Sequence, residues 1–339
     1  MSPSAHSRLA TVLLLCAGLQ GCAPTSRAQA PARGSTPDGF EVWAFHAPWD
    51  PRSAESAARN LNRIDVLVSG WIALDTIGGR PLVLYRDTLA RPGASRARYA
   101  ALVTCWLGDR FHPSTVLRLA DDQAALARTA GTLASHAAEH GYDALVLDFE
   151  GHEPEQLPRL MYVAKSIADS AHARGVDEIV LCIPAVDRAY PADTLLSVVD
   201  VVLPMLYDEH WSTSGPGPVS SPAWVRASLE RRVAEAGAVD VMAGLPLYGY
   251  FWRTDTAVAR TVGVTEARRL AGEWGVALSR DSATRTLTAR SQRGELWVTD
   301  AVLLRELLGH ARALGVRRVA LWRLGLEDPA LWDVLRPDS

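Results

Sequence analysis

Short apolar runs recur along the chain after residue 38, and helical or loop stretches separate them. This alternation is typical of a parallel sheet wound by helices. The runs predict eight strands, at residues 42–45, 66–69, 101–104, 144–149, 179–183, 201–205, 241–245 and 319–322. Eight strands close a (β/α)₈ barrel, so the pattern predicts an α/β chain built as a TIM barrel.

Apolar residues at helical spacing occupy the stretches between many of these runs. The predicted helices lie at residues 53–61, 121–140, 156–174, 222–236 and 300–314. Asp121 and Asp300 are predicted to cap two of them. A glycine stands where each of four helices should stop, at Gly141, Gly175, Gly237 and Gly315.

Two stretches depart from the regular alternation. The unit between the second and third strands shows no helical pattern, and its Gly78-Gly79 pair predicts a turn. Residues 261–299 hold a short helical pattern and two strand-like runs. We therefore predict a small α+β insertion between strands seven and eight.

The amino terminus has the build of an export signal. Arg8 precedes an apolar run at 9–19 that is too short to span a bilayer. Residues 19–22, LQGC, resemble the lipobox of bacterial lipoproteins, which implies a signal peptide at 1–21 and lipid attachment at Cys22. A secretory signal with an incidental cysteine is the alternative. Residues 22–38 are rich in Ala, Pro, Ser and Thr and predict a flexible tether before a barrel at 39–339.

This amino terminus predicts a protein that is exported to the bacterial cell envelope and held at a membrane through Cys22. Ala23 after that cysteine favours the periplasmic side of the outer membrane. The net charge of −3 gives no reason to expect nucleic acid, and we expect a monomer. Cys105 and Cys182 lie in apolar runs, so buried free thiols are expected. With neither zinc-ligand spacing nor a glycine-rich phosphate loop, the sequence predicts no metal or organic cofactor.

The run at 144–150 ends in two carboxylates spaced by two. Successive side chains of a strand alternate between faces, so Asp148 and Glu150 share a face with Ala144 and Val146. A strand that frays into a polar loop would explain such acids equally well. The carboxyl ends of the other predicted strands favour a site, because they bring tyrosines, acids and several of the eleven tryptophans to one rim. Aromatic faces and carboxylates are what a carbohydrate site requires.

Three motifs carry a family resemblance. Residues 143–150, DALVLDFE, resemble the D-G-x-D-x-D-x-E signature of glycoside hydrolase family 18, the chitinase-like barrels. Residues 204–208, PMLYD, resemble the M-x-Y-D signature at strand six, and residues 320–322, ALW, resemble the segment with the family's tryptophan at strand eight. The stretches 207–211, 214–218 and 321–332 are similar to the bacterial branch found in multidomain polysaccharide enzymes and cell-wall hydrolases. The resemblance spans about residues 40–335. Ala144 and Val146 depart from the signature, which has Gly and Asp there.

The resemblance implies hydrolysis of β-1,4-linked N-acetylglucosamine polymers, such as peptidoglycan, chitin-like oligomers or an exopolysaccharide. The reaction would be retaining and assisted by the substrate's own acetamido group. Glu150 would protonate the leaving oxygen, Asp148 would hold the acetamide N–H, and Tyr207 would bind the acetamide oxygen. Trp322 would form the floor beneath that sugar, and Asp208 would position sugar hydroxyls.

Met205, Tyr248 and Trp252 are further candidate substrate contacts. Core filling is the alternative for Met205, packing against the insertion is the alternative for Tyr248 and Trp252, and a loop cap is the alternative for Asp208. Because Val146 replaces an acid, a sugar-binding chitinase-like lectin is the second functional hypothesis. A barrel hydrolase for a different glycosidic linkage is the third.

Overall fold

The computed structural model describes residues 39–335 apart from residue 94. The predicted signal peptide, the tether and Cys22 lie outside these residues. Within the described part, none of the helices is both long and apolar enough to cross a membrane.

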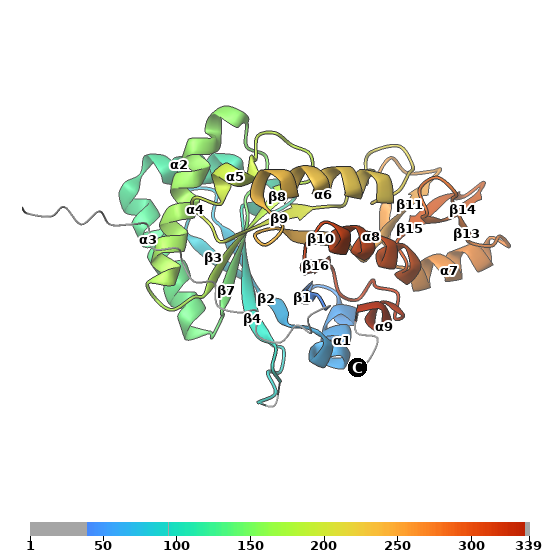
Figure 1. Cartoon of the computed structure of the whole chain (residues 1–339), viewed down its shortest axis with the longest axis horizontal. Coiled ribbons are helices and arrows are strands. Elements are labelled where there is room, and N and C mark those ends of the chain that lie inside the picture. Colours follow the sequence, from blue (N-terminus) through green and yellow to red (C-terminus); the bar gives the residue numbers. More distant parts are fainter. Residues whose placement is uncertain (1–38, 94, 336–339) are drawn as a thin grey trace, which may run out of the picture. The chain divides into compact units, whose positions relative to one another are not determined.

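Eight parallel strands form a closed barrel, as the sequence predicts (Figure 1). The strands run in the order β1-β16-β10-β9-β8-β7-β4-β2, and pairing between β1 and β2 closes the ring. The barrel strands are β1 (Glu41–Phe45), β2 (Val66–Leu74), β4 (Arg98–Thr104), β7 (Ala144–Asp148), β8 (Glu178–Pro184), β9 (Val201–Met205), β10 (Met242–Pro246) and β16 (Arg318–Trp322).

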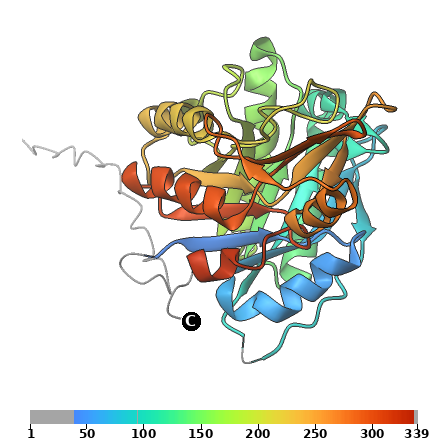
Figure 2. The same cartoon turned by 90° about the vertical axis from the view of Figure 1, so that its right-hand side faces the viewer.

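Helices surround this sheet on its outer face (Figures 1 and 2). They are α1 (Pro51–Asn60), α2 (Pro113–Asp121), α3 (Gln123–Glu139), α4 (Leu157–His172), α5 (Ala192–Leu195), α6 (Pro222–Ala236), α8 (Ala301–Ala313) and α9 (Leu331–Leu335), with 3₁₀ turns η1 (Leu61–Arg63) and η2 (Pro154–Gln156). The predicted glycine stops all have positive φ, from 63° to 83°. That region is costly for residues with a Cβ atom, so the chain uses glycine to leave these helices.

One predicted helix cap is correct and the other is wrong. The Asp300 side chain accepts a hydrogen bond from the backbone N–H of Leu303 at 3.0 Å. Asp121 is instead the last residue of α2, and Asp122 caps α3 by accepting from the N–H of Ala125 at 2.9 Å. The predicted helix at 121–140 corresponds to α3, and the sequence analysis missed α2, a separate helix whose own apolar face includes the buried Val116.

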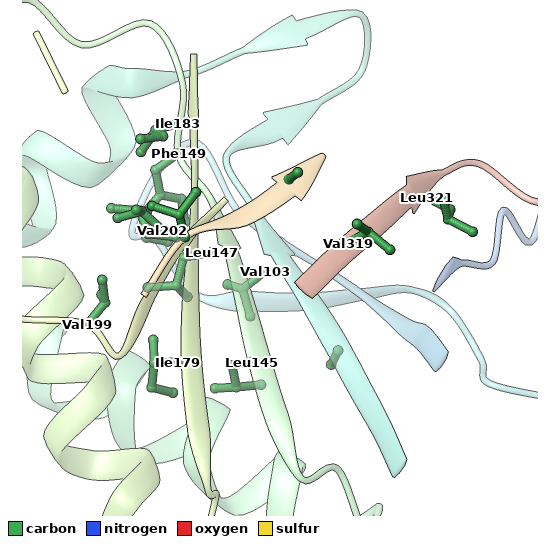
Figure 3. Packing of buried hydrophobic residues seen from close by; sticks show 14 of the residues in the cluster. Val103, Leu145, Leu147, Phe149, Ile179, Ile183, Val199, Val202, Val319 and Leu321 are labelled. Atoms are coloured by element: carbon green, nitrogen blue, oxygen red, sulfur yellow. The ribbon is translucent and has the colours of Figure 1, made fainter. Parts of the chain in front are cut away.

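The alternation of side chains along each strand produces two apolar layers. Inward residues such as Ala144 and Val146 pack with one another inside the barrel. Outward residues such as Leu145, Leu147 and Phe149 pack beneath the helices, and Figure 3 shows them together along β7. This confirms the strand parity on which the prediction of the acidic pair depends.

An ion-pair network lies at the amino ends of the strands. Arg318 donates to both carboxylate oxygens of Glu178 at 2.6 and 2.7 Å and to Glu41 at 3.3 Å. Arg98 donates to the same Glu41 oxygen at 2.7 Å. The network joins four strands, β1, β4, β8 and β16, at the end of the barrel opposite the predicted rim.

A hairpin replaces the helix that would ordinarily follow β2. The Asp75 side chain accepts from the backbone N–H groups of Ile77, Gly78 and Gly79, which builds the turn predicted from the glycine pair. Strand β3 (Pro81–Tyr85) then returns antiparallel to β2. A second small hairpin, β5 (Trp106–Leu107) with β6 (Arg110–Phe111), follows β4.

The predicted α+β insertion lies between β10 and β16, and it starts earlier than residue 261. Strand β11 already belongs to its five-stranded sheet, because β11 pairs with both β12 and β15. The insertion comprises β11 (Gly249–Arg253), β12 (Arg260–Val262), α7 (Val264–Glu273), β13 (Ser279–Arg280), β14 (Leu287–Ser291) and β15 (Gly294–Val298). The aromatic run at 250–252 conceals this strand in the sequence, since it follows β10 almost without a break.

Candidate active site

Asp148 and Glu150 lie at the carboxyl end of β7, above the interior layer of the barrel. Val146, one step below them, is fully buried. Both acids are only partly buried, so they are accessible from the rim. Their carboxyl groups interact directly, and each changes the ionisation of the other.

The neighbouring strand β4 holds Asp148 in place. Thr104, which stands in register with Asp148, donates its hydroxyl to Asp148 Oδ2 at 3.0 Å. The same hydroxyl oxygen accepts the backbone N–H of Trp106 at 2.9 Å, which directs the hydroxyl proton toward the acid. Burial raises the pKa of Asp148 to about 6, against the lowering effect of its hydrogen bonds with Thr104 and Glu150.

The surroundings of Glu150 favour its protonated form. Burial raises its pKa well above the ordinary value, and the charges of Asp148 and Asp208 raise it further. A carboxyl group that stays protonated near neutral pH can act as a general acid, while its ionised neighbour stabilises positive charge.

Strand β9 leads into the second group of site residues. Asp208 has a positive φ of 61° and accepts hydrogen bonds from the hydroxyls of Tyr248 at 2.5 Å and Tyr250 at 3.1 Å. One side of Asp208 is exposed to solvent. Desolvation by the surrounding groups nevertheless raises the pKa of Asp208, while the hydrogen bonds from Tyr248 and Tyr250 lower it. Tyr207 contacts Tyr248 edge-on at 6.3 Å between ring centroids.

Trp322 stands at the end of β16 and packs against the inner layer of the barrel. Its ring meets Phe45 at 5.3 Å and Trp71 at 6.1 Å between centroids. The Trp322–Arg323 peptide bond is cis. Met205, at the end of β9, also packs partly buried on the inner layer. The barrel therefore brings Asp148, Glu150, Tyr207 and Trp322 to one end, as the sequence predicts.

Two of the predicted substrate contacts have internal partners instead. Tyr248 is 4% exposed and uses its hydroxyl on Asp208, so it positions that acid. Trp252 is 8% exposed, and its indole N–H donates to the carbonyl of Ser214 at 2.9 Å. Trp252 thus fixes the loop after β9 against the insertion. Packing, the alternative that the sequence left open, accounts for both residues.

Sequence reasoning missed Thr104 and Tyr250 as residues that position the acids. The strand pattern offered a signal for Thr104, because a hydroxyl at the inward carboxyl end of a strand reaches the rim. Tyr250 follows Tyr248 at the two-residue spacing of a strand face, but the strand in question was not predicted.

Both buried cysteines are free thiols, as expected. Cys182 points into the barrel interior near the acids, and burial raises its pKa well above the ordinary value. Burial raises the pKa of Cys105 to about 12. Among the described residues, no group of three or more His, Cys, Asp or Glu side chains is arranged to hold a metal ion.

Known proteins share this arrangement of strands and helices. No family model matches the chain. A cortical fragment-lytic enzyme of Bacillus subtilis is 25% identical over 234 residues, which cover 64% of this chain and 54% of that protein. The chain thus spans about half the length of this curated relative.

Solved structures match more of the chain. A chitinase from Chromobacterium violaceum has a TM-score of 0.75 at 18% identity, covering 88% of this chain and 98% of that one. The spore cortex-lytic enzyme SleL of Bacillus megaterium has a TM-score of 0.77 at 17% identity, covering 88% of this chain and 74% of that one. These likenesses show that the chain shares the barrel fold of chitinases and spore cortex-lytic enzymes.

Proposed function

We propose that this protein is a glycosidase that hydrolyses a β-1,4-linked polysaccharide containing N-acetylglucosamine, by substrate-assisted retaining catalysis. The observation that carries the proposal is the interacting pair of Asp148 and Glu150, in which Glu150 has the raised pKa of a general acid and Thr104 holds its partner. The names of the similar proteins, chitinase and spore cortex-lytic enzyme, support a polysaccharide substrate.

In the first step, the carbonyl oxygen of the substrate's acetamido group attacks the anomeric carbon. The bond from that carbon to the glycosidic oxygen breaks, and the Glu150 proton passes to the departing oxygen. A cyclic oxazolinium ion remains. Asp148 accepts its N–H and stabilises its positive charge, while the Tyr207 hydroxyl donates to the acetamide oxygen and Trp322 supports the sugar face.

In the second step, water attacks the same carbon from the side that the leaving group vacated. Glu150, now ionised, takes the proton of the water, and the oxazolinium ring opens to restore the acetamido group. Two inversions at one carbon give net retention. The charge of Asp148 assists both steps, because the positive charge lies on the acetamido nitrogen throughout the lifetime of the intermediate.

Hydrolysis of matched glucosamine oligomers tests this proposal. We expect release of β-configured reducing ends from acetylated oligomers and no release from deacetylated ones, because only an acetamido group can supply the nucleophile. Glu150→Gln should lower kcat by a factor of about 100 or more, the loss typical of a missing general acid. Glu155→Gln, an exposed acid on η2, is the matched control.

Binding of acetylated oligomers without hydrolysis would instead favour the lectin hypothesis. Buried Val146 motivates that hypothesis, since it removes a carboxyl group that the family signature places beneath Asp148. Hydrolysis that proceeds equally well on sugars without an acetamido group would contradict the substrate-assisted mechanism.

We further propose that the protein is lipid-anchored in the bacterial envelope through Cys22. The apolar run at 9–19 and the LQGC sequence that follows it support this localisation. Incorporation of labelled fatty acid into the wild-type protein, and its loss in Cys22→Ala, is the expected result. Release of an unlabelled protein into the soluble envelope fraction would favour the ordinary secretory signal.

A further inference from the structure

The general acid of the proposed mechanism lies beyond the end of its strand. Strand β7 ends at Asp148, so the pairing with β4 and β8 stops before the chain reaches Glu150. Gly151 follows with a positive φ of 81°, and the chain turns there. The position of this turn matters, because a catalytic group that moves by about 1 Å can lose roughly 100-fold in rate. Contacts other than strand pairing have to fix the backbone of Glu150.

One hydroxyl bridges the backbone on both sides of Glu150. The Tyr190 hydroxyl donates to the carbonyl oxygen of Phe149 at 3.1 Å and accepts the backbone N–H of His152 at 3.1 Å. A phenol hydroxyl has one proton and free lone pairs, so both bonds form together. The Cys105 thiol also approaches the Glu150 carbonyl, but at 3.9 Å, and a thiol is a weak donor. Tyr190 is therefore the stronger of these two contacts on the turn that carries the acid.

This bridge is shielded from water. Tyr190 is 1% exposed and His152 is 4% exposed. Burial raises the pKa of Tyr190 well above its ordinary value, against the lowering effect of the bond from His152, and the charge of Glu150 raises it further. The hydroxyl therefore keeps its proton. Without that hydroxyl, the Phe149 carbonyl and the His152 N–H would lose this partner in a buried place, where an unmet hydrogen bond is costly.

Helix α6 holds Tyr190 in turn. Arg232 of α6 donates to the carbonyl oxygen of Tyr190 at 2.6 Å and to that of Pro184, the last residue of β8, at 2.6 Å. The Arg232 side chain is fully buried. One guanidinium thus joins the start and the end of the loop that carries Tyr190, and this loop is fixed against the barrel.

We propose that Tyr190 is a positioning residue for the general acid, and that its hydroxyl bridge holds Glu150 where the carboxyl group reaches the glycosidic oxygen. The inference rests on the proposed function and adds to it a residue from outside the rim. Tyr190 acts through Glu150 and lies in the outer apolar layer of the barrel, away from the inner layer beneath the sugar. Its loss should therefore impair proton transfer and leave sugar binding in place.

Tyr190→Phe removes the hydroxyl and keeps the ring. On an acetylated glucosamine oligomer, kcat should fall about 10- to 100-fold with little change in KM, because the acid is displaced and the sugar contacts remain. Tyr142→Phe is the matched control. Tyr142 is 4% exposed, its hydroxyl donates to Asp87 at 3.3 Å, and it precedes β7 at the opposite end of that strand. The control should keep the kcat of the wild type.

The nature of the leaving group separates positioning of the acid from a general loss of structure. Dinitrophenolate departs without a proton, whereas a sugar alkoxide needs one. In Tyr190→Phe, kcat/KM should fall at least about tenfold for an acetylated oligomer and less than about twofold for an acetylated disaccharide linked to 2,4-dinitrophenol. The ratio of the two values does not depend on the fraction of enzyme that is folded, so partial unfolding of the variant does not obscure the result.

Combination with Glu150→Gln provides a second readout. If Tyr190 acts through Glu150, the double variant should cleave the oligomer no more slowly than Glu150→Gln alone, because the acid is already absent. Independent effects would instead multiply the two losses.

Three results would overturn the positioning role and leave the proposed function intact. These are an unchanged kcat in Tyr190→Phe, equal losses on the two leaving groups, and multiplied losses in the double variant. Failure of the wild-type protein to cleave either acetylated substrate would overturn both the role of Tyr190 and the proposed function.

Discussion

Thr104 and Asp148 stand directly opposite one another on adjacent parallel strands, and the threonine hydroxyl donates to the carboxylate at 3.0 Å. Val146 lies one step below, where it offers no polar group to Asp148. Among the described residues, Thr104 is a side chain outside the acidic pair that donates a hydrogen bond to this carboxylate. The orientation of Asp148 depends on a strand other than its own.

Replacing Thr104 by valine removes the hydroxyl and keeps the shape of the side chain. Hydrogen bonds to charged groups contribute about 1.5–3 kcal/mol, so kcat should fall roughly 10- to 100-fold while KM changes little. Steady-state kinetics on an acetylated oligomer provide the measurement. Thr104→Ser keeps the donor and should retain most of the activity. A valine variant with full kcat would show that Asp148 does not depend on this hydroxyl.

The alkaline limit of activity should move when Asp208 loses its charge. Burial, Asp148 and Asp208 all raise the pKa of Glu150, in that order. Asp208→Asn removes one of the two repulsive charges, so the pKa of Glu150 falls and Glu150 loses its proton at a lower pH. The alkaline limb of the kcat/KM profile should therefore shift to lower pH. Asp169→Asn, an exposed acid on α4, should leave the profile in place, and an unmoved limb in Asp208→Asn would contradict the coupling.

Asp148→Asn should stabilise the folded protein at neutral pH. The folded-state pKa of Asp148, about 6, lies above its ordinary value of 3.8, so the folded state binds the proton more tightly than the unfolded state. The stability from this group is fully present below about pH 4 and is lost as the pH rises through 6. The amide should therefore add roughly 1–3 kcal/mol at pH 8 and much less at pH 4. Denaturant unfolding at the two pH values measures the difference, and an equal gain at both would contradict the sign.

Arg232 is a buried charge on which a loop depends. It is 0% exposed and donates to the backbone carbonyls of Pro184, Ala185, Asp187 and Tyr190 and to the Glu235 carboxylate. Arg232→Met leaves these acceptors without partners and should cost about 3–5 kcal/mol of unfolding free energy. Arg226→Met, on the exposed face of the same helix, should cost far less, because water screens the ion pair of Arg226 with Glu230. Similar losses of unfolding free energy in the two variants would show that the buried contacts of Arg232 do not stabilise the protein.

The local pattern was enough to predict the barrel and the acidic pair. Two-residue periodicity fixes which side chains of a strand share a face, so Asp148 and Glu150 follow Ala144 and Val146 without knowledge of any other strand. Glycine stops and most helices are also local, because they depend on backbone conformation and on contacts within one or two turns. The missed helix α2 marks the limit of this reasoning, since a helix of nine residues offers only a short apolar pattern.

The tertiary structure decided which side chains contact Asp148 and the neighbouring Asp208. The contact of Thr104 with Asp148 requires the register of β4 against β7, and the contact of Tyr250 with Asp208 requires the insertion to fold back on the loop after β9. Each of these contacts joins segments far apart in sequence, and strand register is set by packing across the whole barrel. The sequence alone therefore determined that two acids share one face at the end of β7, and the closed barrel determined which side chains surround them.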